Sequence, residues 1–300
     1  MTHADLFRTV AAPTRLYVIG NGFDRYHGIP SDFRDFARYL AAADPTVYRM
    51  VGEYFSADAR FWADFETCLA EFDQDQAVDY ASQFLDDEGY GDFQYELEQI
   101  ATGLSSGLRG RFAEWVRGLP IPQRGTVGRP LNVDPTAVFL SFNYTPTLEQ
   151  IYGVARERIL HIHGDAADPA SELVLGHGWS RAPEDSLNFG PVGPDDDWRV
   201  RDGIEYIDQF FADTFKPTDK LLEENRPFFD GLAGLREILI MGHGMAEVDE
   251  PYFEEIMRRV DLASTRWIVS VFGDVEKRRE RFGQYGIAPW LIEYRPLIDF

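Results

Sequence analysis

The stretch RLYVIGNGFDRYHGIPSDFRDFARYL, residues 15–40, decides the fold that we expect for this chain. Residues 15–19 form a nearly continuous apolar run, which is typical of a short strand buried on both faces of a parallel sheet. Residues 31–40 carry apolar side chains at helical spacing, after a serine that is placed to cap a helix. Because Gly20 and Gly22 follow the apolar run directly, the stretch predicts a strand, a glycine loop and a helix.

Strands and helices alternate again in the second half of the chain. The expected strands cover residues 137–142, 158–162, 173–175, 237–241, 267–272 and 290–294. The expected helices between them cover residues 145–152, 205–229, 249–260 and 275–282. Strands that alternate with helices indicate an α/β fold with a doubly wound, mostly parallel, Rossmann-like sheet.

Two segments interrupt this alternation. Residues 45–125 carry aromatic side chains at helical spacing, for example Trp62 and Phe65, and predict helices without strands. Residues 180–235 combine a loop rich in proline, glycine and aspartate with a helical part. We therefore expect a single Rossmann-like domain over residues 1–300, with an all-helical insertion and a second insertion of loop and helix at these two places.

Composition and charge exclude several classes of protein. The chain has 300 residues, and 44% of them are hydrophobic, which is ample for a large core. Its formal net charge is −22, so nucleic acid is not expected as the main partner. No apolar run of about 18 residues and no basic leader is present, so we expect no membrane span and a cytoplasmic location. The single cysteine, Cys68, excludes an internal disulfide and a multi-cysteine zinc site.

Five of the six histidines lie at or just after the carboxyl end of an expected strand, mostly beside a glycine. They are His27, His161, His163, His177 and His243. In an open parallel sheet, ligands bind in the crevice beyond the carboxyl ends of the strands. The histidines therefore predict a binding site in that crevice.

The glycine loop indicates what this site binds. A glycine-x-glycine turn after a buried strand lets the backbone approach a pyrophosphate, and the next helix directs its N–H groups at that anion. Gly20, Asn21 and Gly22 have this form, although Arg25 stands where the usual dinucleotide fingerprint has a third glycine. The loop alone is a weak signal for a nucleotide, so the neighbouring motifs have to support it.

Ordered blocks over nearly the whole chain resemble the AbiH family of bacterial abortive-infection proteins. The blocks are IGNGFDRYHGIPSDFRDF (19–36), FWADFE (61–66), SFNYTPTLEQIYG (141–153), ILHIHGD (159–165), LVLGHG (173–178) and GHGMAEVDEPYFEEI (242–256). This resemblance implies a role in defence against phage, and a protein partner or a homo-oligomer is among the assemblies that we expect.

The same blocks are similar, more distantly, to sirtuin-like domains that bind NAD. This resemblance implies that Gly20, Asn21 and Gly22 hold the pyrophosphate, and that Phe33 and Arg34 line the nicotinamide side of the pocket. The further candidates for the pocket lie in the glycine loop and at the other strand ends, and they are Phe23, His27, Thr145, Gly176, His177, Gly242 and His243.

Two catalytic residues follow from the same similarity: Asn143 would meet the nicotinamide ribose, and His163 would act as the base there. Cleavage of the nicotinamide–ribose bond also requires negative charge near the ribose, which Asp24 or Asp32 could supply. The chain departs from the sirtuin pattern, since Thr145 replaces an aspartate, Ser31 is an extra residue and the zinc-binding cysteines are missing. We therefore expect NAD to be the substrate or ligand, with hydrolysis to nicotinamide and ADP-ribose in place of protein deacylation, and we expect no metal.

Two other functions stay open at this point. Metal-dependent hydrolysis of a phosphoester would use histidine and carboxylate ligands. The candidate ligands are His161, His163, His177, His243, Asp24 and Glu66. The other possibility is a non-catalytic nucleotide sensor or scaffold that acts with a partner, for which the acidic residues 83–100 offer a docking surface.

Most of these polar residues also have a purely structural interpretation. Asn143 and Asp249 can cap the helices that follow them, and Asp24 can hydrogen-bond within its own loop. His163 can be a strand-end histidine bonded to backbone, and Glu66 must either be paired or face the cleft.

Overall fold

The structure is a computed structural model that describes residues 13–85, 91–193, 196–273 and 275–300. In these residues, six strands form one parallel sheet with the order β3-β2-β1-β4-β5-β6. The strands are β1 (Arg15–Ile19), β2 (Val138–Ser141), β3 (Ile159–His161), β4 (Glu237–Met241), β5 (Arg266–Val271) and β6 (Ile292–Pro296). The predicted α/β fold with a parallel, Rossmann-like sheet is confirmed.

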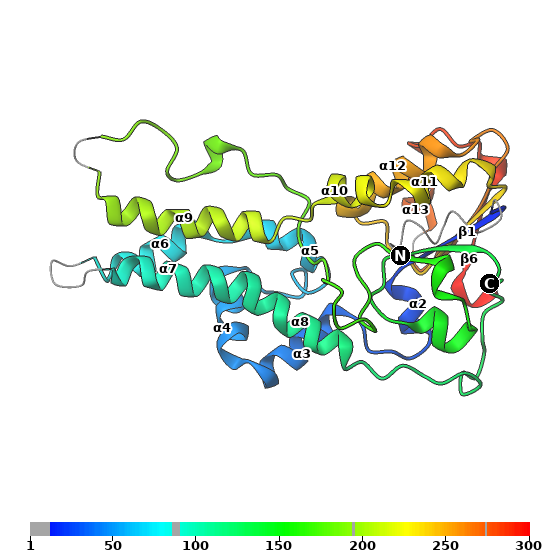
Figure 1. Ribbon diagram of the computed structural model, residues 1–300, viewed down its shortest axis with the longest axis horizontal. Helices are drawn as coiled ribbons and strands as arrows, with labels where there is room; N and C mark the ends of the chain where they lie inside the picture. The colour runs from blue at the N-terminus through cyan, green and yellow to red at the C-terminus, as the bar shows by residue number, and fades with distance from the viewer. Residues whose placement is uncertain (1–12, 86–90, 194–195, 274) are drawn as a thin grey trace. The chain divides into compact units, whose positions relative to one another are not determined.

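The chain divides into two compact units, and unit 1 holds the whole sheet. Unit 1 consists of Met1–Asp32, Val116–Val174 and Pro217–Phe300. Its α-helices, within the described residues, are α2 (Asn21–Tyr26), α10 (Thr218–Glu224), α11 (Arg226–Asp230), α12 (Glu250–Arg259) and α13 (Val275–Gly283), as labelled in Figure 1.

Unit 2 is helical and consists of Phe33–Trp115 and Leu175–Lys216. Its α-helices are α3 (Phe33–Ala43), α4 (Pro45–Tyr54), α5 (Phe65–Cys68), α6 (Gln74–Ser82), α7 (Asp92–Thr102), α8 (Leu108–Arg117, which ends in unit 1) and α9 (Trp198–Asp213). Figure 1 shows α7 and α9 side by side, with both helices running in the same direction. They approach so closely that a Cβ on Gly203 would lie 2.4 Å from the ring of Phe93.

Alternate side chains of each strand enter two apolar clusters, one on each face of the sheet. On β1, Leu16 joins the cluster that includes Tyr252 of α12, whereas Tyr17 joins the cluster that includes Phe23 of α2. Because helices cover both faces, every central strand is buried on both sides, and this explains why the strands read as continuous apolar runs.

The strand order reverses between β1 and β4. From β1 the chain goes to β2 and then β3 on one side, and from β4 it goes to β5 and β6 on the other side. In an open α/β sheet this reversal is the topological switch point, beyond which ligands bind. The loops after β1 and β4 are therefore the first place to look for a site.

Three local predictions are wrong. The glycine loop contains helix α2, which sequence periodicity misses because six residues with one buried apolar side chain, Phe23, are too short to show a period. The strand expected at residues 173–175 is absent, since this short run makes a single backbone bond to the sheet region, from Val174 N to His163 O. The helix expected at 145–152 is only a short π-helix, η3 (Leu148–Tyr152).

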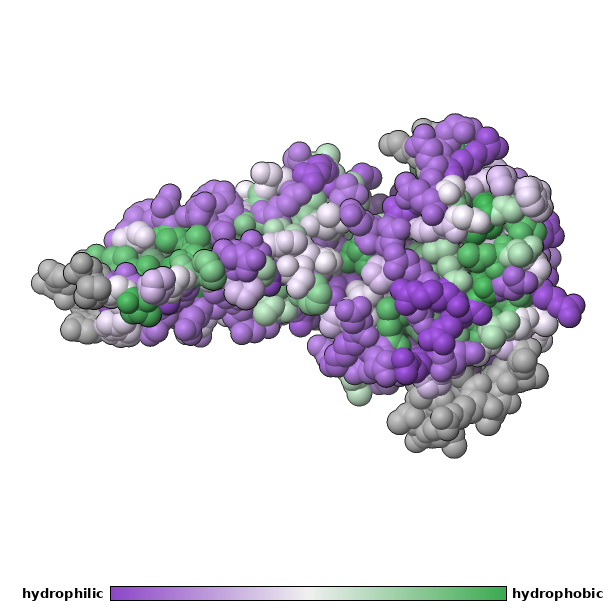
Figure 2. Space-filling view, turned by 90° about the horizontal axis from the view of Figure 1, so that it is seen from above, coloured by the Kyte–Doolittle hydropathy of each residue, from purple (hydrophilic) through white to green (hydrophobic). Residues whose placement is uncertain are grey.

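The described surface is mostly hydrophilic, with some large apolar side chains exposed. Figure 2 shows this mixture on one face of each unit. In unit 2 the most exposed apolar side chains include Phe189, Val192 and Trp198, and in unit 1 they include Phe272 and Trp290. Among the helices of the described residues, none has both the length and the apolar character that crossing a bilayer requires.

Candidate functional site

The loops after β1 and β4 contact each other through their backbones. Gly22 N donates to Gly242 O at 2.8 Å, and Gly20 N donates to Met241 O at 3.0 Å. A Cβ on Gly20 would lie 2.5 Å from His243 Cα, and one on Gly22 would lie 2.8 Å from Gly242 O. Close packing of two loops at the switch point thus accounts for both glycines, and pyrophosphate binding by this loop stays a prediction.

Asn21 and Ser31, at the two ends of the α2 segment, are joined by a short hydrogen bond. The Ser31 hydroxyl donates to the side-chain oxygen of Asn21. This bond holds the chain that leaves α2 against the start of the same helix.

Asp24 is buried and lies against the loop that follows β2. It is 2% exposed, and its Oδ2 accepts a hydrogen bond of 2.5 Å from the Thr145 hydroxyl. Thr145 in turn shares a hydrogen bond of 2.9 Å with Thr147. Burial raises the pKa of Asp24 to about 6, although hydrogen bonds from Thr145, Thr147 and Asn143 act in the opposite direction. This carboxyl group therefore changes its charge close to neutral pH.

Asn143 links the ends of β1 and β2. Its Nδ2 donates to Gly20 O at 3.1 Å, and its backbone O accepts from the Ser141 hydroxyl. The η3 helix is preceded by Thr147 at its N-cap position, so Asn143 is not the cap of that helix. Asn143 and Asp24 thus lie together around the carboxyl end of β1.

Two histidines flank the carboxylate of Asp249. His163 Nε2, which follows β3, lies 3.8 Å from Asp249 Oδ1, and His243 Nε2, which follows β4, lies 3.6 Å from Asp249 Oδ2. All three side chains are at least nine-tenths buried. Although Asp249 occupies the N-cap position of α12, its side chain makes no capping hydrogen bond. The predicted cap is therefore wrong, and the carboxylate faces the two imidazoles.

The loop after β4 fixes the orientation of His243. Met245 N donates to His243 Nδ1 at 2.8 Å, so the neutral imidazole carries its proton on Nε2, towards Asp249. Met245 makes this bond with a φ of 57°, a left-handed conformation that is unusual for a residue other than glycine. The Phe142 ring lies against both histidines, with centroids 5.3 Å from His163 and 4.2 Å from His243.

His27 and Phe23 serve the packing of α2. Nδ1 of His27 donates to Phe23 O at 2.7 Å, and Nε2 accepts from the Tyr152 hydroxyl at 2.7 Å. Burial lowers the pKa of His27, so the ring is neutral near pH 7. Phe23 is fully buried beside the same rings.

One cluster of the described residues has donors placed to hold a metal ion. One ligand atom from each of Glu149, His161 and Asp165 lies within 4.8 Å of the others. His161 Nδ1 donates to Asn143 O at 3.0 Å, which directs Nε2 towards Glu149 Oε1 at 3.2 Å. Arg156 forms a short ion pair with Asp165, so a protein cation already neutralises part of the cluster.

Burial and a carboxylate act in opposite directions on His161. Burial alone lowers the pKa of His161, but the neighbouring Glu149 raises it above its ordinary value overall.

His161 and His163 have different carboxylate partners. The regular strand ends at His161, and after the following turn His163 lies beside Asp249 and not beside Glu149. In a regular strand, His161 and His163 would lie on the same face and could share a metal ion. Because the strand ends at His161, the two histidines do not share a site.

The remaining predicted site residues, Phe33, Arg34, Gly176 and His177, belong to unit 2. The Phe33 ring packs on that of Phe65, with centroids 4.8 Å apart. A Cβ on Gly176 would lie 2.2 Å from the backbone oxygen of Thr214, so this glycine permits a close chain contact. Their place in a nucleotide pocket stays a prediction.

His177 and Glu66 have structural partners inside unit 2. His177 N donates to Thr214 O and His177 O accepts from Lys216 N, both at 2.8 Å. Burial lowers the pKa of His177 to about 4. Glu66 Oε1 lies 2.8 Å from the ammonium group of Lys216, a lysine with no exposed surface. Of the two alternatives for Glu66, pairing or facing the cleft, the structure shows pairing.

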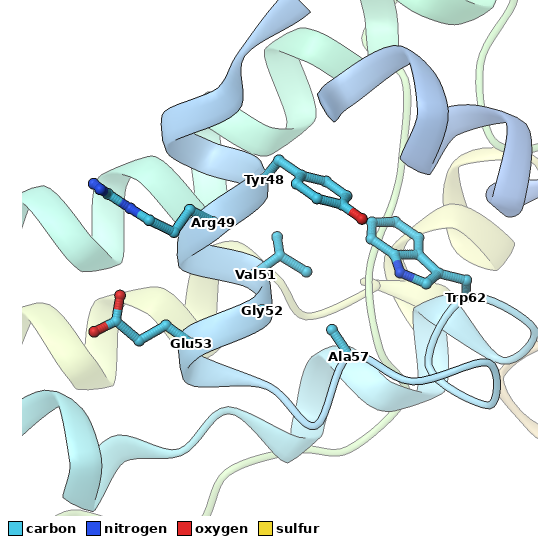
Figure 3. A pocket seen from close by; sticks show the side chains of 7 residues that line it. All are labelled: Tyr48, Arg49, Val51, Gly52, Glu53, Ala57 and Trp62. Atoms are coloured by element: carbon cyan, nitrogen blue, oxygen red, sulfur yellow. The ribbon is translucent and has the colours of Figure 1, made fainter. Parts of the chain in front are cut away.

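Unit 2 also contains a pocket of about 520 Å³ between α4 and the following segment. It is lined by Tyr48, Arg49, Val51, Gly52, Glu53, Ala57 and Trp62. Figure 3 shows the Tyr48 ring reaching towards Trp62, whereas Arg49 and Glu53 point away from these rings. The pocket is thus an aromatic hollow without a facing acid–base pair, and none of the predicted site residues lines it.

Four residues of the site escape sequence reasoning. Glu149 lies inside a helical pattern, Thr147 and Asp165 are ordinary polar residues beside expected elements, and Asp249 has the sequence position of a helix cap. Only the position of Asp249, six residues after His243, could have suggested its role, because both follow the same strand.

Comparison with known proteins gives one match. The family model described as "Bacteriophage abortive infection AbiH" matches residues 16–271, which include all the strands except β6 and all the polar clusters described above. No curated protein and no solved structure matches the chain.

Proposed function

The chain belongs to the AbiH family of bacteriophage abortive infection proteins, and we propose that it hydrolyses NAD to nicotinamide and ADP-ribose during abortive infection. The observation that carries the proposal is the carboxylate of Asp249 between His163 and His243, beside the switch point of the sheet. An acid–base group of this kind, at the place where nucleotides bind in open α/β sheets, is suited to activating water.

The reaction consumes one water and releases one proton. The bond between the nicotinamide nitrogen and ribose C1′ breaks, and its electron pair leaves with nicotinamide. Positive charge then develops on the ribose until the oxygen of water bonds to C1′. In this proposal His163 accepts the proton of that water, and Asp249 stabilises the resulting imidazolium.

Asp24 and Asn143 have supporting roles in this scheme. Since the pKa of Asp24 is about 6, its carboxylate is mostly ionised at pH 7 and can stabilise positive charge on the ribose. Asn143, whose amide nitrogen is bonded to Gly20, would bind the ribose hydroxyl groups through its amide oxygen.

The test is the release of nicotinamide from NAD by the purified chain over several hours. His163→Gln should lower the rate by about 100-fold or more, the usual contribution of a general base. His161→Gln is the matched control, since it breaks a histidine–carboxylate pair at the end of the same strand without touching Asp249. Equal losses in both variants, at equal folded fractions, would refute the role of His163.

The same assay separates hydrolysis from nucleotide sensing. A sensor or scaffold subunit would bind NAD, detected by calorimetry, and would release no nicotinamide, even when isolated from phage-infected cells. That outcome would replace the enzymatic proposal with the non-catalytic one.

A second candidate function is metal-dependent hydrolysis of a phosphoester. It is favoured by the cluster of Glu149, His161 and Asp165, whose nitrogen and oxygen donors suit zinc or manganese. Elemental analysis of the protein, followed by titration of the metal-free form with Mn²⁺ and Zn²⁺, tests it. One tightly bound ion that is lost in Glu149→Gln would favour this candidate.

A further inference from the structure

The glycine loop of unit 1 has few amide groups to offer to an anion. Gly20 N and Gly22 N, which face the switch point, donate to the backbone oxygens of Met241, at the end of β4, and of Gly242, directly after it. Helix α2, which follows this loop, has only six residues. If the substrate is a dinucleotide, as the proposed function requires, another donor has to bind its phosphates.

Arg278 is a cation at the loop after β4. It lies on α13, the helix that follows β5, and its Nη1 donates to Gly244 O at 2.8 Å. Gly244 is the residue directly after His243, which contacts Asp249. The Arg278 guanidinium is thus hydrogen-bonded to the loop that carries His243 of the candidate site.

The other arginines of α13 have carboxylate partners. Arg279 pairs with Glu276 at 2.8 Å, and Arg281 pairs with Glu250 at 2.7 Å. Among the described residues, no carboxylate forms an ion pair with Arg278, although the chain carries 51 acidic residues against 29 basic ones. The guanidinium of Arg278 thus has a neutral backbone oxygen as its partner, and a phosphate could serve as its counter-ion.

Arg278 is partly buried and lies near a second cation, Arg281. Burial lowers the pKa of Arg278, and the positive charge of Arg281 lowers it further, while Tyr294 and Tyr285 act in the opposite direction. A partly buried guanidinium of this kind gains most from a charge-assisted hydrogen bond to a multiply charged anion such as phosphate.

There is room for such an anion next to Gly244. Apart from atoms of Gly244 itself and of its two chain neighbours, no heavy atom lies within 4 Å of the position that a Cβ on Gly244 would occupy. Phe272, the first residue after β5, is fully exposed and does not cover the neighbouring strand end.

From these observations we propose that Arg278 and the backbone at Gly244 form a phosphate-binding subsite, which takes the diphosphate of a nucleotide. The guanidinium keeps one N–H on the Gly244 carbonyl and offers its others to the phosphate oxygens. This inference extends the proposed NAD hydrolysis by placing the phosphates on the β4–β5 side of the switch point.

The test compares the binding of inorganic pyrophosphate and of NAD to three forms of the full chain by calorimetry. Arg278→Gln should weaken the binding of both ligands by about 10- to 100-fold, the usual effect of losing a charge-assisted bond. Arg279→Gln, which removes the neighbouring charge from the same helix, should change neither affinity by more than about twofold. Nicotinamide riboside, which lacks phosphates, should respond to neither substitution. Arg278→Lys keeps the charge and should restore part of the affinity if Arg278→Gln folds poorly.

The outcomes separate this inference from the proposed function. Wild-type protein that binds no pyrophosphate, or an Arg278→Gln variant that binds it as tightly as wild type, would overturn the subsite. If nicotinamide is released but Arg278→Gln has an unchanged KM for NAD, the subsite is wrong and the hydrolysis stands. If pyrophosphate binding depends on Arg278 but no nicotinamide is released, the subsite stands and the hydrolysis is wrong.

Discussion

At the scale of single residues, the glycines after β4 differ sharply in the space around them. Gly242 has a φ of 68°, and a Cβ there would lie 2.2 Å from Phe23 N. Apart from its own atoms and those of its two chain neighbours, Gly244, two residues on, has no heavy atom within 4 Å of the equivalent position. The same GHG motif therefore contains one glycine that backbone packing requires and one that it does not.

This difference predicts unequal effects of two alanine substitutions. Gly242→Ala should lower the free energy of unfolding by about 3 kcal/mol or more, because it adds a backbone clash to a left-handed conformation. Gly244→Ala should change it by less than about 0.5 kcal/mol. Urea denaturation of both variants measures this. Similar stabilities would show that the contact between the β1 and β4 loops is not rigid.

The raised pKa of Asp24 predicts that the free energy of unfolding depends on pH. This pKa is about 6 in the folded protein and near 3.9 in an unfolded chain. Between these two pKa values the folded state binds more protons than the unfolded state. The free energy of unfolding therefore falls as the pH rises from one pKa to the other, by about 3 kcal/mol in total. Asn at position 24 does not ionise, so the stability of Asp24→Asn relative to wild type should grow by about 1 kcal/mol from pH 5 to pH 7.

The control for this experiment is Asp134→Asn in the same unit. Hydrogen bonding to Thr136 holds the pKa of Asp134 below its usual range, so that carboxylate stays ionised from pH 5 to pH 7. The stability difference between this variant and wild type should therefore be constant over the interval. A constant difference for Asp24→Asn as well would contradict the raised pKa.

Residue types and strand ends were enough to predict part of the site from the sequence. Asp24, Asn143, His163 and His243 all lie at the carboxyl edge of the sheet because each follows a strand that its apolar run identifies. The sequence position of Asp249 predicts a helix cap, but this position does not determine the direction of the side chain. That direction depends on contacts with residues that are distant in the sequence.

At the scale of secondary-structure elements, Lys216 and Glu66 join the two segments of unit 2. Glu66 is on α5, and Lys216 is the last residue of the segment that contains α9. The ammonium group has no exposed surface and lies 2.8 Å from Glu66 Oε1. Removal of the carboxylate would leave the ammonium buried without this partner, which is far more costly than loss of an exposed pair.

We therefore expect Glu66→Gln to lower the free energy of unfolding of unit 2 by about 3 kcal/mol or more. The double variant Glu66→Gln with Lys216→Met should recover part of this loss, because no buried charge remains. Glu71→Gln breaks the exposed pair of Glu71 with Arg60 and should cost less than about 1 kcal/mol. Denaturant curves followed by tryptophan fluorescence compare these variants, and equal losses for Glu66→Gln and Glu71→Gln would contradict the argument.

Elements were predictable where one periodicity dominated. The run at residues 237–241 coincides with β4, and the prediction for 275–282 falls one residue short of the end of α13, because buried strands and amphipathic helices each leave a clear pattern. Residues 173–175 are apolar enough to be buried, but three residues are too few to form a row of backbone hydrogen bonds with a neighbouring strand. Their apolar composition therefore predicts a strand that the structure does not have. Helix α2 depends on the contact of Gly22 and of its N-cap residue Gly20 with the end of β4 and the following loop, and no local sequence pattern contains that contact.

At the scale of the whole molecule, the acidic composition sets the long-range field. The net charge of −22 is a property of the sequence alone, and the hydrophilic face in Figure 2 is compatible with it. Such a field repels an anionic substrate at a distance, whereas Arg278 can attract a phosphate only at contact. The two effects have different ranges, so salt can separate them.

This separation gives a prediction for catalysis by the proposed hydrolase. Between about 0.01 M and 0.15 M salt the screening length falls from about 30 Å to about 8 Å, so long-range repulsion of anionic NAD weakens. The kcat/KM for NAD should therefore rise several-fold with salt in steady-state assays of nicotinamide release. Nicotinamide riboside, which is cationic, should show the opposite trend, because the same field attracts it. A kcat/KM for NAD that falls steadily with salt would mean that local cations, Arg278 among them, outweigh the net charge.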